Sequence, residues 1–176
     1  MKILNNEIPT RIYFWNKERG LLKPPVFDVE ISFLLEESSE YYRLPAVFPK
    51  LDALGDLVVF AIGWLSKLSV TQLFPTATYA YQTTYQPKNI VGGIYDILDD
   101  HSYGEYSNLT VTLEKLVYTC LSGMYELGYD PSIVMDEVVK HIESRVGSVG
   151  ESGKWEKDKT AILYEPNFTL ALLPKE

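Results

Sequence analysis

Apolar and polar residues along this chain recur mainly with the 3.6-residue period of an α-helix, and few runs alternate as a strand does. The helices that this period predicts cover residues 29–44, 49–67, 90–99, 109–127 and 131–145. Asp28 and Asp130 suit helix N-caps, and Gly128 suits a C-cap. Pro45 ends the first of these helices, because its ring cannot continue one. The expected fold class is therefore all-α, with a bundle of four to five helices in a single domain over residues 1–176.

The segments outside these helices are less regular. Residues 1–27 and the tail 154–176 are expected to be irregular or extended, with one strand-like run at 168–173. Residues 70–107 hold six of the thirteen tyrosines, together with prolines and glycines, and are expected to form an ordered insertion with much loop. Its tyrosines could stack on a base or line an oligomer interface. Three of them lie close together: Tyr79, Tyr81 and Tyr85.

Composition narrows the classes of function. Hydrophobic residues make up 46% of the chain, yet no apolar run reaches the roughly 18 residues of a membrane span. The N-terminus lacks the apolar core of a signal peptide, and the single Cys120 excludes an intramolecular disulfide and a cysteine-rich metal site. We therefore expect a cytoplasmic protein, in the host cytoplasm if it is viral. The net charge of −8 argues against a broad nucleic-acid surface and leaves phosphate binding to metal ions or local basic residues.

Two sets of carboxylates lie on consecutive predicted helices. At about 100° per residue, Glu36, Glu37 and Glu40 fall on one face of the first helix. Asp52 and Asp56 are four residues apart and share a face of the second. Because the connection between the helices is short, they should pack antiparallel. At about 1.5 Å rise per residue, both sets then fall at matching heights.

Carboxylates that converge in this way repel one another unless a cation lies between them. With Glu30, which shares the face of the three glutamates, up to six would meet. Magnesium suits such a set, because it takes oxygen ligands and keeps waters for substrate phosphates. Two simpler interpretations stay open: the glutamates can form a solvated face, and Asp52 can compensate the helix dipole. Neither interpretation suits Asp56 as well, because the apolar residues 57–62 follow it directly and place it close to the core. A carboxylate at that depth needs a partner.

A Glu-Glu-x-x-Glu helix followed by a second acidic helix resembles the MazG-like and phosphoribosyl-ATP pyrophosphohydrolase-like enzymes, an all-α superfamily. The residues that match the first element are Glu36, Glu37 and Glu40. Asp56 matches the final aspartate of the second element. The chain departs from the MazG form at Ala53, where a glutamate would stand. Asp52 matches instead the Asp-Ala-Leu-x-Asp form of the phosphoribosyl-ATP-like branch.

Flanking segments extend this resemblance and link the chain to bacteriophage-type members. They are residues 15–21, 142–145 and 153–158. Arg145 fits the end of the Ser-Asn-x-Ser-Lys run of the phosphoribosyl-ATP-like branch. Ile142 stands where that run has its asparagine, so nucleotide contacts of the asparagine do not transfer.

The resemblance implies a Mg²⁺-dependent nucleoside triphosphate pyrophosphohydrolase, usually a homodimer or homotetramer, in which Mn²⁺ can replace Mg²⁺. The implied ligands are Glu37, Glu40 and Asp56, with Asp52 or Glu36 assisting or holding a second ion. One carboxylate would orient or deprotonate a water for attack on the α phosphorus. Arg145, Lys154 and Lys157 would neutralise the triphosphate. The basic tail can equally be a solvated linker.

Two rival functions stay open. A catalytically inactive helical protein would use the same bundle to bind nucleotides or a protein partner, and Ala53 and Ile142 favour it. A plain assembly protein would turn its acidic faces to solvent. Neither a Walker A run nor a metal-binding histidine pair is present, and His101 and His141 are expected to be structural or on the surface. Base and sugar preference are open, and damaged nucleotides, the dNTP pool and alarmones all stand as substrates.

Overall fold

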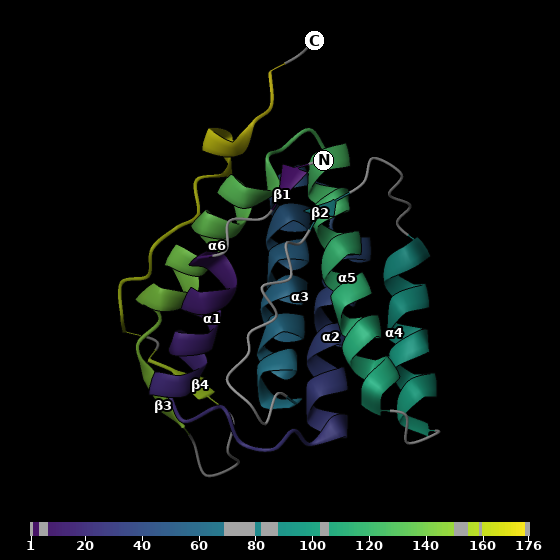
Figure 1. The fold of residues 1–176 in the computed structure, drawn as a ribbon. Coiled ribbons are helices and arrows are strands. Elements are labelled where there is room, and N and C mark those ends of the chain that lie inside the picture. The colour runs from purple at the N-terminus through teal and green to yellow at the C-terminus, as the bar shows by residue number, and fades with distance from the viewer. Residues whose placement is uncertain are drawn as a thin grey trace.

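The fold of this chain is described by a computed structural model that covers residues 2–3, 7–68, 80–81, 88–102, 106–149, 155–158 and 160–174. The described residues form six α-helices, one short 3-10 helix and two small antiparallel ribbons. The helices are α1 (Glu7–Glu18), α2 (Phe27–Arg43), α3 (Val47–Leu68), α4 (Lys88–Ser102), α5 (Tyr106–Glu126) and α6 (Pro131–Ser144) (Figure 1). The expected all-α class is confirmed.

Helix α3 forms the centre of the molecule (Figure 1). Its buried residues run through most of its length and point to nearly every side, from Leu51 to Leu65. A helix that is apolar all round is stable only when other elements cover it. Helices α1, α2, α5 and α6 all contact α3 and supply that cover. None of the helices in the described ranges is both long and apolar enough to cross a membrane.

Helices α2 and α3 form the hairpin that the sequence predicts, with shifted boundaries. Helix α3 begins at Val47, so Pro49 is its third residue. Proline is tolerated there because the first amide groups of a helix have no intrahelical acceptor. The prediction of Asp28 as N-cap of α2 was wrong: the N-cap is Val26, and Asp28 lies in the first turn. A carboxylate in that turn still interacts favourably with the helix dipole.

The junction between α5 and α6 matches its prediction. Gly128 has φ +90°, a left-handed conformation that suits glycine, and its amide donates to the carbonyl of Tyr125 over 2.9 Å. Asp130 caps α6 by accepting from the amide of Ser132 at 2.9 Å, and Pro131 occupies the first turn. These local signals end one helix and start the next within a few residues.

The expectation of an irregular N-terminal segment was wrong, because residues Glu7–Glu18 form helix α1. Its buried positions are Pro9 and a narrow stripe of three residues spaced four apart, Ile8, Ile12 and Asn16. The stripe is short and ends in a polar residue, so its period is weak in the sequence. Contacts with α3 and α6 stabilise the helix, as is usual for short helices.

Residues 88–102 of the predicted insertion at 70–107 form a longer helix than the predicted 90–99. Helix α4 is 15 residues long, and Ile90, Ile94 and Ile97 belong to the common core. It packs along α5, so residues 88–102 are part of the helical assembly. Tyr79 and Tyr85 lie outside the described residues. Tyr81 lies in strand β2 (Ala80–Tyr81), which pairs with β1 (Lys2–Ile3).

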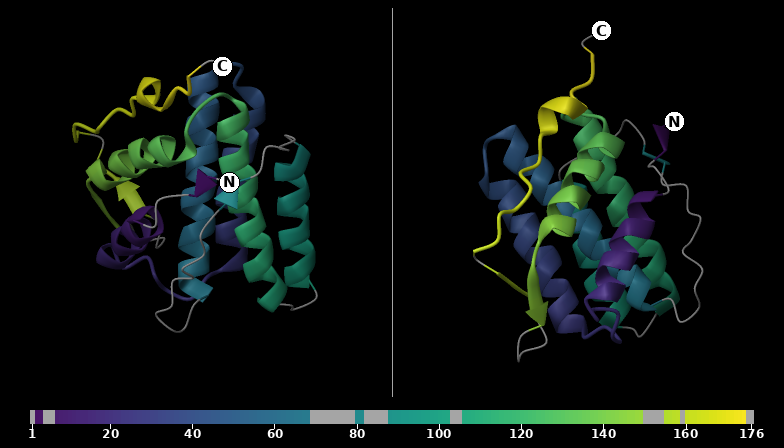
Figure 2. Two further views of the ribbon diagram at one scale, coloured as in Figure 1. Left: turned by 45° about the horizontal axis from the view of Figure 1, so that its top comes forward. Right: turned by 90° about the vertical axis from the view of Figure 1, so that its left-hand side faces the viewer.

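The C-terminal region differs from its predicted strand at 168–173. Residues Phe168–Ala171 form a 3-10 helix, and Leu172 makes a single bridge to Tyr129. Before it, β3 (Gly147–Val149) pairs with β4 (Trp155–Lys157). We call residues 160–174 the C-terminal strap, because they run alongside α6 (Figure 2).

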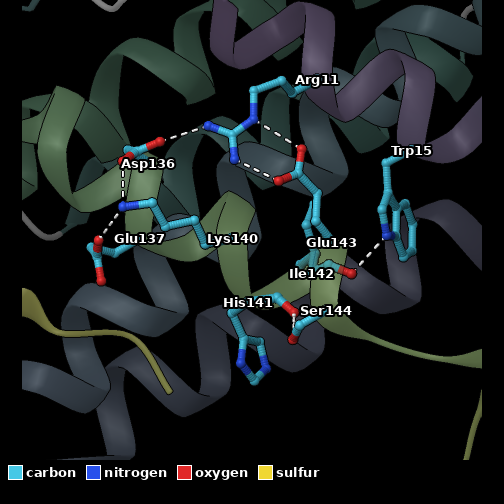
Figure 3. A network of polar contacts seen from close by, with 9 residues as sticks. All are labelled: Arg11, Trp15, Asp136, Glu137, Lys140, His141, Ile142, Glu143 and Ser144. Carbon is cyan, nitrogen blue, oxygen red and sulfur yellow. Dashed lines mark hydrogen bonds and ion pairs between the residues drawn. The ribbon is translucent and has the colours of Figure 1, made fainter. Parts of the chain in front are cut away.

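Polar contacts fasten both α1 and the strap to α6, and Figure 3 shows those between α1 and α6. Arg11 donates from Nε and Nη2 to both carboxylate oxygens of Glu143, at 2.9 and 2.6 Å, and from Nη1 to Asp136 at 2.6 Å. Such two-pronged pairs are the strongest arginine–carboxylate contacts. Glu137, which is 1% exposed, accepts from Lys140 at 2.7 Å and from the Tyr164 hydroxyl at 2.5 Å.

Candidate metal centre

The predicted acidic residues lie on α2 and α3, which run antiparallel. Their direction is fixed at the far end of the hairpin, where Glu30 near the start of α2 meets Lys67 near the end of α3. The remaining carboxylates lie toward the connection between the helices. Four are half-buried, Glu37, Glu40, Asp52 and Asp56, and Glu36 is exposed. Both sets therefore occupy the same half of the hairpin, as their spacing predicts.

The prediction that Glu30 joins the acidic set was wrong. Its Oε1 lies 2.5 Å from Nζ of Lys67, and both side chains are largely buried. A buried charge is stable when it is paired and hydrogen-bonded, and Lys67 provides both. The helical angle alone predicted Glu30 on the acidic face. Glu30 lies near the start of α2, however, far from the connection between the helices, and there it is level with Lys67 of α3.

The other acidic residues of both helices influence the ionisation of Glu37. Burial is the largest cause that raises its pKa, and with the negative charges of Asp56, Glu40, Glu36 and Asp52, in that order of strength, it brings the pKa to about 8. Glu36 and Glu40 lie on the same helix as Glu37, and Asp52 and Asp56 lie on α3. Negative charge from both helices therefore acts on Glu37.

These side chains fit Mg²⁺ by their chemistry, because all are carboxylates and Mg²⁺ prefers oxygen ligands. The crowding of negative charge at Glu37 is the kind that a divalent cation relieves. As the side chains stand, no three His, Cys, Asp or Glu residues within the described ranges gather closely enough to hold an ion. Formation of a complete ligand shell requires the carboxylates to turn toward one another.

Arg145 reaches this group from the end of α6. Its Nη2 lies 3.8 Å from Oδ2 of Asp56, and the two side chains are only 14% and 16% exposed. Arg145 is the C-cap residue of α6, and its amide donates to the carbonyl of Ile142 at 3.1 Å. Arg145 is the predicted phosphate-binding residue whose side chain is described, and it lies at the acidic helices.

The side chains of the other two predicted phosphate-binding residues are outside the described part of the structure. Lys154 lies outside the described residues, as does the neighbouring Lys159. Lys157 lies in strand β4, for which the backbone pairing alone is described. Arg43 is a further cation near the group, with Nη2 3.7 Å from Oε1 of Glu40, but its side chain is 70% exposed.

A glycine that the sequence did not single out lets α6 approach α3. A Cβ added to Gly55 would lie 2.5 Å from Cγ2 of Val138. Gly55 directly precedes Asp56, and Val138 lies two helical turns before Arg145. The close crossing of the two helices at Gly55 therefore sets the distance from which Arg145 reaches Asp56.

Helix α1 supports the same end of α6. Trp15 donates from Nε1 to the carbonyl of Ile142 at 2.7 Å (Figure 3). The guanidinium of Arg19 stacks 4.6 Å over the Trp15 ring and donates to the carbonyl of Arg145 at 3.3 Å. The segments 15–21 and 142–145, which carried the resemblance from opposite ends of the sequence, thus lie together.

Both histidines make structural contacts. The ring of His101 stacks on Phe27 with ring centres 3.5 Å apart. Nδ1 of His141 lies 2.5 Å from the carbonyl oxygen of Tyr164 in the C-terminal strap. Neither contact is with the acidic residues of α2 and α3.

Comparison of the chain with known protein families, with curated proteins and with solved structures gives no match. The functional argument therefore depends on the residues of this chain.

Proposed function

We propose that this protein is a Mg²⁺-dependent nucleoside triphosphate pyrophosphohydrolase, which converts a (d)NTP and water into a (d)NMP and pyrophosphate. The observation that carries the proposal is the negative charge that four carboxylates from two antiparallel helices exert on Glu37. The matching Glu-Glu-x-x-Glu and Asp-x-x-x-Asp patterns of the pyrophosphohydrolase superfamily support it.

In this proposal Glu37, Glu40 and Asp56 hold the principal ion, and Asp52 or Glu36 assists or holds a second one. Bound Mg²⁺, or Mn²⁺ in its place, supplies Lewis-acid activation of the α-phosphate and of a water. A carboxylate that is not a ligand accepts the proton of this water. Arg145 binds the negative triphosphate, together with Lys154 and Lys157.

A homo-oligomer in the cytoplasm belongs to the same proposal. Exposed apolar residues on the adjacent helices α2 and α4 support self-association, because contiguous apolar surface commonly marks an interface. They include Leu35 and Tyr42 on α2 and the stripe of Val91, Tyr95 and Leu98 on α4. Light scattering coupled to size exclusion measures the number of chains in the particle.

A second candidate is a helical nucleotide-binding or protein-interaction module without catalytic activity. It is favoured by the separation of the carboxylates, since none of the described side chains forms a ready-made ion site. Ala53, at the position of a MazG glutamate, favours it as well. The two candidates differ in metal-dependent turnover.

A substrate panel tests the proposal. Each (d)NTP is incubated with protein and Mg²⁺ or Mn²⁺, and nucleoside monophosphate and pyrophosphate are identified by chromatography. We expect equal amounts of the two products, loss of both with EDTA, and a fall of at least about 100-fold in Glu37→Gln or Glu40→Gln. Glu126→Gln, an exposed glutamate on α5, is the matched control and should keep its activity. Unchanged turnover in Glu37→Gln and Glu40→Gln would rule out the proposed site.

A further inference from the structure

Arg145 has a fixed backbone and a loosely held charged group. Its amide donates to the carbonyl of Ile142, and its own carbonyl accepts from Arg19 at 3.3 Å. Within the described part of the chain, the guanidinium has in contrast only the 3.8 Å contact with Asp56, which is longer than a hydrogen bond. Its Nε is buried and has no hydrogen-bond partner among the described residues.

Arg11 in the same molecule shows what a satisfied guanidinium looks like. It makes a two-pronged pair with Glu143 at 2.9 and 2.6 Å and a third bond to Asp136. Arg145 has the same donors, but charge rather than hydrogen-bond geometry holds it at Asp56. A buried donor without an acceptor costs free energy, so this arrangement favours any acceptor that offers Arg145 better geometry.

We propose that Arg145 is an exchangeable counter-ion of Asp56. In the metal-free protein its guanidinium neutralises Asp56, and it leaves Asp56 for the triphosphate oxygens when the divalent cation and nucleotide bind. This inference rests on the proposed function and assigns Arg145 a second role within it. Phosphate oxygens match the planar fork of arginine and would satisfy Nε as well as the terminal nitrogens.

Competition follows from this exchange. A divalent cation and Arg145 interact with the same carboxylate, so the arginine lowers the affinity for the cation while no nucleotide is present. A nucleotide that attracts Arg145 removes the competitor, and the coupling is reciprocal.

Titration with Mn²⁺ alone, followed by the paramagnetic resonance of free Mn²⁺, tests the exchange without any turnover. We expect Arg145→Gln to bind Mn²⁺ roughly tenfold more tightly than wild type, within the usual range of coupling between sites. Arg145→Lys keeps the charge and should stay close to wild type. Arg43→Gln removes an equal charge beside Glu40 but an exposed one, so its effect should be smaller.

A second measurement uses the wild-type chain. The Nε–H resonance of Arg145, assigned by its loss in Arg145→Lys, should shift when Mg²⁺ is added, while that of Arg11 should not. A resonance of Arg145 that stays unmoved at saturating Mg²⁺, or wild-type Mn²⁺ affinity in folded Arg145→Gln, would overturn the exchange and leave the proposed function standing. Absence of Mn²⁺ binding in wild type and variants alike would overturn both.

Discussion

At the scale of single residues, Glu37 and Arg145 act on Asp56 in opposite directions. The negative charge of Asp56 is the strongest of the neighbouring charges that raise the pKa of Glu37, to about 8. Arg145, with Nη2 3.8 Å from Oδ2 of Asp56, offsets part of that charge. The charge of the metal-free site therefore changes with pH through Glu37, while Arg145 offsets part of it at Asp56.

This balance predicts how stability varies with pH in the metal-free protein. A carboxyl group whose pKa rises from 4.5 to about 8 on folding stabilises the fold below pH 4.5, and that contribution is lost as the pH rises through 8. Wild-type protein in EDTA should thus lose stability from pH 6 to pH 9, as measured by urea denaturation. Glu37→Gln cannot ionise and should be the more stable of the two at pH 9. If the stability of the two proteins varied with pH in the same way, that result would contradict the raised pKa of Glu37.

Magnesium provides the complementary control for that experiment. The cation binds the ionised carboxylates, so it should stabilise wild type most at pH 9 and Glu37→Gln much less. The exposed control Glu126→Gln should follow wild type under both conditions.

At the scale of elements, the crossing of α3 and α6 determines the geometry of the site. Gly55 allows Val138 to pack directly against the backbone of α3, and the same stretch of α6 ends in Arg145. The side chain of valine is stiff in a helix, so it cannot move aside to admit a methyl group. The helices would have to separate instead, and Arg145 would move away from Asp56.

Gly55→Ala should therefore destabilise the fold by about 1–3 kcal/mol, although alanine is the better helix former. Gly92→Ala is the matched control in α4: its Cβ would meet nothing within 4 Å, so it should be neutral or stabilising. The double variant Gly55→Ala with Val138→Ala should regain part of the stability and of the pyrophosphohydrolase activity. Urea denaturation and product formation measure both, and a Gly55→Ala protein as stable as wild type would contradict the close crossing.

The elements that the sequence predicted well are those whose ends carry local signals. Pro45 and the Gly128 to Pro131 stretch mark boundaries through their own backbone preferences, which no tertiary contact has to supply. Helix α1 was missed because its stripe is narrow and becomes stable only against α3 and α6. Helix α4 was predicted too short, since Gly92 and Gly93 weaken the helical pattern near its start.

The candidate site was predictable to a similar degree. Helical spacing places Glu37 and Glu40 on one face and Asp52 and Asp56 on another, and a short connection turns these faces together. The pairing of Glu30 with a lysine and the approach of Arg145 depend on positions 37 and 89 residues away, respectively. No local pattern encodes contacts of that kind, so they became visible only in the folded chain.

At the scale of the whole molecule, helix α1 and the C-terminal strap both pack on α6 and form polar contacts with it. Arg11 near the N-terminus pairs with Glu143, and the C-terminal strap is held through Glu137. Burial alone would raise the pKa of Glu137, but hydrogen bonds from Lys140, Tyr164 and the amide of Asn167 outweigh it and lower the pKa. Glu137 is thus a buried, ionised anchor of the strap, which Ser144 and His141 also hold through the backbone of Tyr164.

Removal of this anchor should be costly. Glu137→Ala leaves the Tyr164 hydroxyl without its acceptor and Lys140 with Asp136 as its remaining partner, and we expect a loss of about 1–3 kcal/mol of stability. In this variant, the rate of hydrogen exchange over residues 160–174 should rise above that of wild type, and it should rise more there than over α2 and α3. Glu165→Ala, an exposed change in the same strap, is the control and should alter neither quantity. Unchanged protection of the strap in Glu137→Ala would contradict its role as anchor.

The central claim is that the acidic faces of α2 and α3 hold a divalent cation between them. Anomalous diffraction from crystals grown with Mn²⁺ and a non-hydrolysable nucleotide tests it most directly. The account predicts a manganese peak within coordination distance of Glu37, Glu40 and Asp56, with Arg145 turned from Asp56 toward the phosphates. A nucleotide-bound crystal with no peak between these helices, or with the three carboxylates directed into solvent, would contradict it.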